Sequence, residues 1–126
     1  MIATSEPKPF SVCVKKAPDA EDGVAIVEIE GFLDAHTAQD FEKAIEGWLR
    51  DGYARFVLDA AKLRYISSAG IGSVMRLVQE ARRREGEVIM LKPPEKVFGV
   101  LELLGFSEII TFSDTLDEAL AGFAAR

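Results

Sequence analysis

The chain has little cysteine, histidine or tryptophan, with one of each in 126 residues. The single cysteine, Cys13, cannot form a disulfide within the chain, which is typical of proteins from a reducing compartment. Its neighbours Val12 and Val14 are apolar, so we expect Cys13 to be a small core residue. The single histidine, His36, leaves no His-rich metal site and no Ser/His/Asp arrangement for a hydrolase, and we expect it at the surface. We therefore expect no enzyme activity, no metal and no cofactor.

Positive charge is also in the minority, with 15 Lys and Arg against 21 Asp and Glu, a net charge of −6. Nucleic-acid binding needs a dominant basic surface, and anionic lipid headgroups repel an acidic chain. No apolar stretch reaches membrane-spanning length, and the N-terminus lacks the pattern of a signal peptide. We expect a cytoplasmic protein that neither binds nucleic acid nor inserts into a membrane.

What the chain does contain is a regular alternation of strand and helix patterns after a flexible lead-in over residues 1–9. The predicted strands are residues 10–16, 24–30, 55–59, 88–91 and 108–112. Predicted helices begin at Thr37, at the two serines of residues 67–68, at residues 93–95, and after a cap at Ser113 or Asp114. The first two strands predict an antiparallel pair, and the later alternation predicts right-handed crossovers. The order β-β-α-β-α-β-α-β-α indicates one α/β domain over residues 10–126, with a mixed, mostly parallel sheet of about five strands and four helices.

Residues 63–72 are predicted to connect a strand to the second helix, with two serines at the helix entrance. If Ser67 is the N-cap, Ile66 and Ile71 have the spacing of a hydrophobic staple. Ser68 is then the first helical residue and points outward. Backbone N–H groups and the helix dipole make such an entrance favourable for a phosphate. From local chemistry alone, capping by both hydroxyls is the more ordinary interpretation.

Two motifs resemble those of one known family. Residues 31–38, GFLDAHTA, are similar to the pattern G-x-L-D-x-x-T-A of the STAS domain. Residues 65–72, YISSAGIG, are similar to the switch loop of the same family, often written D-S-[ST/A]-G-[LI]. The closest resemblance is to the stand-alone bacterial anti-sigma-factor antagonists, and it extends from about residue 10 to the C-terminus.

The resemblance implies a partner switch controlled by phosphorylation. The unmodified domain would bind an anti-sigma factor that is also a serine kinase, the kinase would phosphorylate Ser68 and end the complex, and a serine phosphatase would reset it. Weak homo-oligomerisation is a further option. Ser67 stands where the family often has Asp, which removes one negative charge but keeps a good N-cap. The residues implied to contact the partner or support the switch are Asp34, Thr37, Ser67, Ala69, Gly70, Ile71 and Gly72.

Other interpretations of these residues stay open. Thr37 with Asp40 has the spacing of a capping box, whereas Asp34 fits partner contact and turn formation equally. The glycines at 70 and 72 are expected to let a partner backbone approach, since the third glycine of a dinucleotide loop is missing. Alternative functions are a STAS regulatory subunit of a lipid-transporting ABC system or a nucleotide-binding module.

Overall fold

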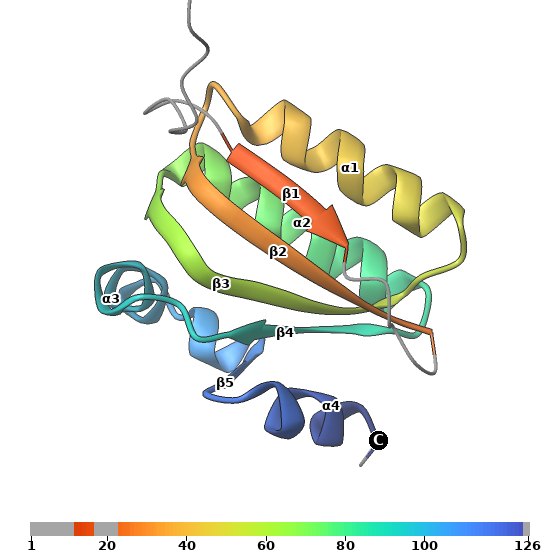
Figure 1. Ribbon diagram of the computed structural model, residues 1–126. Helices are drawn as coiled ribbons and strands as arrows, with labels where there is room; N and C mark the ends of the chain where they lie inside the picture. The colour runs from red at the N-terminus through yellow and green to blue at the C-terminus, as the bar shows by residue number, and fades with distance from the viewer. Residues whose placement is uncertain (1–11, 17–22, 125–126) are drawn as a thin grey trace, which may run out of the picture.

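The computed structural model describes residues 12–16 and 23–124, with the backbone alone for residues 12–16 and for residue 124. The lead-in, residues 10–11 of the first predicted strand and the side chain of Cys13 lie outside this description. Figure 1 shows a single sheet with helices packed on it. The strands are β1 (Val12–Lys16), β2 (Val24–Leu33), β3 (Arg55–Ile66), β4 (Glu87–Leu91) and β5 (Thr111–Ser113). The helices are α1 (Ala38–Arg50), α2 (Ser68–Arg83), α3 (Glu95–Leu103), the short 3-10 helix η1 (Phe106–Glu108) and α4 (Leu116–Ala124).

The sheet has the order β1-β2-β3-β4-β5. The edge strand β1 is antiparallel to β2, while β2 to β5 run parallel to one another. Each parallel pair is joined through a helix, as parallel strands require. The predicted mixed, mostly parallel α/β fold is confirmed.

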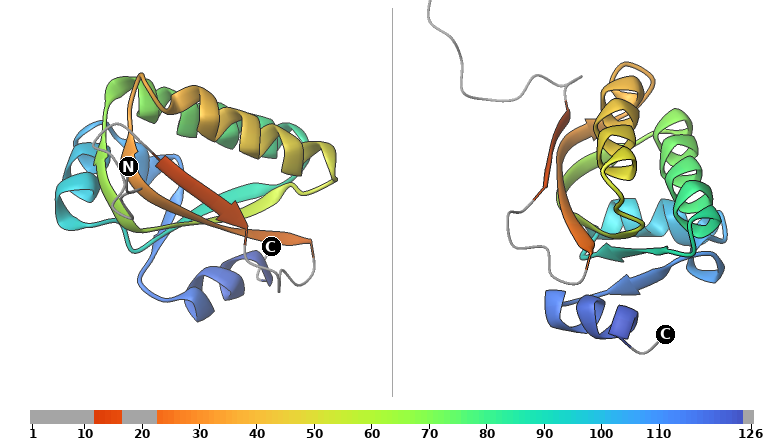
Figure 2. Two further views of the ribbon diagram at one scale, coloured as in Figure 1. Left: turned by 45° about the horizontal axis from the view of Figure 1, so that its top comes forward. Right: turned by 90° about the vertical axis from the view of Figure 1, so that its right-hand side faces the viewer.

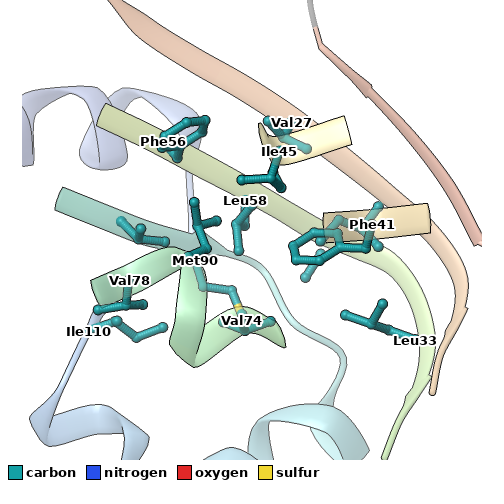
Figure 3. Close-up of a cluster of buried hydrophobic side chains, with 14 of the residues drawn as sticks. Val27, Leu33, Phe41, Ile45, Phe56, Leu58, Val74, Val78, Met90 and Ile110 are labelled. Atoms are coloured by element: carbon teal, nitrogen blue, oxygen red, sulfur yellow. The ribbon is translucent and has the colours of Figure 1, made fainter. Parts of the chain in front are cut away.

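The core has two parts on opposite faces of the sheet. The larger lies under α1, α2 and α3 and contains Phe41, Phe56 and Leu58 (Figure 3). The smaller lies under α4 and contains Val57 and Phe123. Figure 2 shows α1 and α2 side by side over one face and α4 on the other. The central strand β3 is buried on both faces over residues 56–58.

The prediction that β3 ends at Asp59 is wrong, because the strand continues through Ile66. Its second half pairs with β2, with Leu63 beside Gly31, Tyr65 beside Phe32 and Ile66 beside Leu33. Figure 1 shows β3 curving strongly along this half before it reaches α2. The connection to α2 is therefore Ser67 alone, and residues 63–66 belong to the sheet.

Two boundaries in the C-terminal part also differ from prediction. The last strand begins at Thr111, because the N–H groups of Glu108 and Ile110 bond back to Gly105 and Phe106 in a local turn. Gly105 begins this turn in the left-handed conformation that favours glycine, with φ of 81°. The hydroxyl at the start of α4 belongs to Thr115, which accepts from the N–H of Glu118 at 3.1 Å. Neither Ser113 nor Asp114 is the cap, since the helix begins at Leu116, two residues later than a cap at Ser113 requires and one residue later than a cap at Asp114 requires.

Candidate functional site

Ser67 closes the start of α2. It has an extended backbone (φ −101°, ψ 177°), and its Oγ accepts from the N–H of Gly70 at 3.3 Å. Its own N–H donates to the carbonyl of Leu33 at 3.0 Å, which ties the start of α2 to the end of β2. Ile66 and Ile71, at staple spacing, both pack into the larger core. The predicted N-cap is confirmed.

Ser68 is the first residue of α2, and its side chain is exposed. Among the residues that the structure describes, its hydroxyl takes part in no hydrogen bond. The first turn of α2 has no acidic side chain, so the positive end of its dipole has no carboxylate within that turn. The two serines are therefore different in kind: Ser67 caps the helix, and Ser68 presents a hydroxyl to solvent.

The two glycines of the motif also differ. A Cβ on Gly70 would lie 2.3 Å from the carbonyl oxygen of Leu33, whereas one on Gly72 would meet nothing within 4 Å. Gly70 is buried and Gly72 is exposed. The expectation that both glycines admit a partner backbone is thus wrong for Gly70, whose close approach is to its own chain. Gly72 and Ala69 are both exposed, so the solvent-facing side of the first turn of α2 carries only small residues.

Thr37 holds the turn between β2 and α1. Its hydroxyl donates to the carbonyl of Phe32 at 2.7 Å and accepts from the N–H of Asp34 at 2.9 Å, and the residue is 2% exposed. It makes no side-chain cap bond to α1, so the predicted capping box with Asp40 is wrong. The hydroxyl is already used by the preceding turn. Thr37 therefore stabilises the turn from a buried position and is not part of the protein surface.

Asp34 completes this turn and is 8% exposed. Its Oδ1 accepts from the N–H of His36 at 2.9 Å, and its main-chain oxygen accepts from Thr37 and Ala38. These bonds support the turn-forming interpretation of Asp34 over direct partner contact. They also fix the end of β2, where the Leu33 carbonyl holds Ser67. His36 is exposed, as expected.

We expect Thr37→Val to lower the free energy of unfolding by about 1–3 kcal/mol, because a buried N–H and a carbonyl lose their partner without a change in volume. Thr37→Ser keeps the hydroxyl and should recover most of this loss. Urea unfolding of both variants and the wild type would measure the difference. Equal stability of Thr37→Val and the wild type would contradict the role assigned to the hydroxyl.

Three residues beside the serines had no predicted role. The rings of Phe32 and Tyr65 lie 5.7 Å apart between centroids, at 40° to each other. The guanidinium carbon of Arg64 lies 5.9 Å from the centroid of the Phe32 ring. Tyr65 is 49% exposed. No local pattern could have identified this group, because it depends on the pairing of β2 with β3.

A hollow of about 420 Å³ lies elsewhere, between α1 and α2. Its base includes Phe41 and Leu77, and none of the predicted switch residues lines it. At its edge, Arg84 hydrogen-bonds Glu80 at 2.7 Å and, with added attraction from Arg83, holds the pKa of the Glu80 carboxyl below its usual range. Among the described residues, no cluster of three or more His, Cys, Asp or Glu could hold a metal ion, and no helix is long and apolar enough to cross a membrane.

A parallel sheet with one antiparallel edge strand, and a motif serine displayed at the head of the second helix, define the class of this protein: a compact α/β domain of the STAS kind. The STAS domain family model matches residues 15–119. The chain belongs to the STAS domain family. Within it, the chain is of the anti-sigma factor antagonist type, as the relatives below support.

Two relatives support this type, and a further solved structure shows the shared fold. The chain is 30% identical over 110 residues to a Bordetella bronchiseptica protein named as anti-sigma factor antagonist BtrV, covering 87% of this chain and 95% of the other. It is 25% identical to a Thermotoga maritima protein described as an anti-sigma factor antagonist, whose crystal structure superposes with a TM-score of 0.79 over 89% of this chain and 93% of that one. The phosphorylated form of the Bacillus cell fate determinant SpoIIAA shares the fold, with a TM-score of 0.67 and 19% identity over 86% of this chain and 97% of that one.

Proposed function

We propose that this domain is a partner switch controlled by phosphorylation of Ser68. Unmodified, it binds an anti-sigma factor that is also a serine kinase, and phosphorylation by that kinase releases it. A serine phosphatase restores the binding form. The observation that carries the proposal is the difference between the two serines. The Ser67 hydroxyl accepts a hydrogen bond from the Gly70 N–H, whereas the Ser68 hydroxyl is exposed at the helix start.

Electrostatics explain how one phosphate could end binding without unfolding the domain. It adds about −1.5 to −2 charges and three acceptor oxygens. At a helix N-terminus this charge is favourable by about 0.3–1 kcal/mol, so the fold tolerates it. Enclosed by a partner surface, the same group loses its hydration and meets no matching charge. In this proposal the domain is a kinase substrate and not an enzyme. It acts in the cytoplasm, where the anti-sigma factor would be found.

The replacement of the family's usual Asp by Ser67 fits this scheme. Asp and Ser are comparable N-caps, and the Ser67 hydroxyl makes the cap bond in this structure. One negative charge is missing next to the phosphorylation site. The proposal is therefore that Ser67 preserves the geometry of the switch while changing the charge that the matching kinase meets.

The test is incubation with ATP and candidate serine kinases of the anti-sigma factor type from the same organism, followed by intact-mass measurement and peptide mapping. We expect one phosphate, located on Ser68, and none on Ser68→Ala. Ser67→Ala is the matched control, because it loses about 0.5–2 kcal/mol of stability with the cap but keeps the acceptor hydroxyl. A phosphate found on Ser67 alone, or on neither serine with any kinase, would refute the proposal.

A further inference from the structure

The aromatic group next to Ser68 owes its position to an irregularity in the sheet. Gly31 pairs with Leu63 but Phe32 pairs with Tyr65, so the register between β2 and β3 shifts and Arg64 is the extra residue. Strict alternation from the buried Leu63 would turn Tyr65 inward. The shift resets the alternation, so Arg64 and Tyr65 are both exposed and Ile66 is buried. Bulges commonly re-aim a side chain in this way beside functional sites.

The group contributes little to the core. Neither Phe32 nor Tyr65 belongs to the two buried clusters or to the side chains packed against them. Their neighbours Leu33 and Ile66 point into the larger core, so the two rings lie on the sheet face opposite α1 and α2. Among the side chains that the structure describes, this aromatic pair and the guanidinium beside it have no packing role in the core.

Its distance from Ser68 is short compared with the size of a protein interface. Tyr65 lies three positions before Ser68, which limits their Cα separation to roughly 11 Å. A standard interface covers about 800 Å² on each partner, equivalent to a disc of roughly 16 Å radius. An interface of this size centred on Ser68 is therefore wide enough to reach the exposed Tyr65 at the end of β3. Tyr and Arg are among the residues that most often dominate binding energy.

We infer that Phe32, Arg64 and Tyr65 form the main docking contact for the anti-sigma factor, and that this partner carries an apolar pocket for the Tyr65 ring with a carboxylate facing Arg64. This inference rests on the proposed function and adds the surface that selects the partner. Phosphorylation of Ser68 ends the complex by placing charge at the edge of this contact.

The test is the affinity of the purified anti-sigma factor from the same organism for single variants of the full chain. We expect Tyr65→Ala to weaken binding about 30-fold or more, and Tyr65→Phe to bind within about 3-fold of the wild type because it keeps the ring. The Tyr65→Ala protein should keep its melting temperature. When the kinase phosphorylates it, KM should rise and kcat should stay constant, since Ser68 itself is undisturbed.

Arginine at the two ends of β3 provides a charge-matched control. Arg64 and Arg55 are both exposed, and Arg55 lies at the far end of the strand. We expect Arg64→Glu to weaken binding about 10-fold or more, mainly through slower association, and Arg55→Glu to change it less than about 3-fold. Equal losses from the two variants would show a general charge effect and overturn the assigned role of Arg64.

The failures of the inference and of the proposed function are distinguishable. If Tyr65→Ala binds like the wild type while Ser68→Asp does not bind, the docking surface lies elsewhere and the switch stands. A fall in kcat at constant KM would show that Tyr65 positions Ser68 and does not dock the partner. If the wild type is neither phosphorylated on Ser68 nor bound, the proposed function and this inference are both wrong.

Discussion

Ser68→Asp should reduce the affinity for the anti-sigma factor at least about 100-fold, equivalent to about 2.7 kcal/mol, without lowering the melting temperature. The side chain at this position is exposed and unbonded among the described residues, so the substitution removes no contact within the domain. A carboxylate in the first turn of α2 also interacts favourably with the helix dipole. The whole loss of binding free energy therefore arises in the complex, where the Asp carboxylate is desolvated. Calorimetric titration and thermal unfolding would measure the two effects separately.

Ser67→Asp is the matched control, because it introduces the same charge one residue earlier. Asp replaces Ser as an N-cap with little change, so the start of α2 should stay intact. We expect this variant to bind within a few-fold of the wild type, and Ser68→Ala to bind as well as the wild type. Equal losses from Ser67→Asp and Ser68→Asp would show that negative charge anywhere near the helix start is sufficient, and Ser68 would not be the specific switch.

Gly70→Ala should be the most damaging single-methyl change at this site. The added Cβ would lie 2.3 Å from the Leu33 carbonyl oxygen and 2.9 Å from its carbon. Backbone atoms cannot rotate away, so the start of α2 must move off β2 and strain the bond from the Ser67 N–H to the same carbonyl. We expect a loss of about 3 kcal/mol in the free energy of unfolding, the upper range for overpacking. Phosphorylation of Ser68 should slow as well, since its position depends on that contact.

Gly72→Ala adds the same methyl group two residues later, where nothing lies within 4 Å. Alanine is the better helix former by about 0.8–1.0 kcal/mol, so this variant should be as stable as the wild type or more stable. Urea unfolding of the two variants in parallel isolates the steric effect from helix propensity. If Gly70→Ala were as stable as Gly72→Ala, the close approach of α2 to the end of β2 would not be the reason for glycine at position 70.

Local patterns were sufficient for the element order and for the N-cap. The apolar spacing of each helix and strand is a property of neighbouring residues, so it can be recognised without the fold. The same holds for Ser67, whose capping role depends only on Gly70 three residues later and on the staple pair Ile66 and Ile71. Resemblance of the two motifs to the STAS family then indicated Ser68, and the structure separates its exposed hydroxyl from the bonded one of Ser67.

Contacts between distant segments account for what the patterns missed. The second half of β3 lacks regular alternation, and it is a strand because β2 pairs with it. The Thr37 hydroxyl was missed for a different reason, because it bonds the carbonyl of Phe32 five residues earlier in the same turn. Periodicity identifies neither interaction, since it does not specify which group a backbone or side-chain atom will bond.

The sequence by itself thus determined the α/β class, the order of the elements and the serine that caps α2. Only the tertiary structure decided that Gly70 faces the Leu33 carbonyl and that the shift in register turns Tyr65 outward beside Ser68. The physical reason is the separation, along the chain, of the residues that interact. Capping and amphipathic spacing act within one or two turns of chain, whereas steric fit and strand register depend on residues about thirty positions apart, brought together only when β2, β3 and α2 pack.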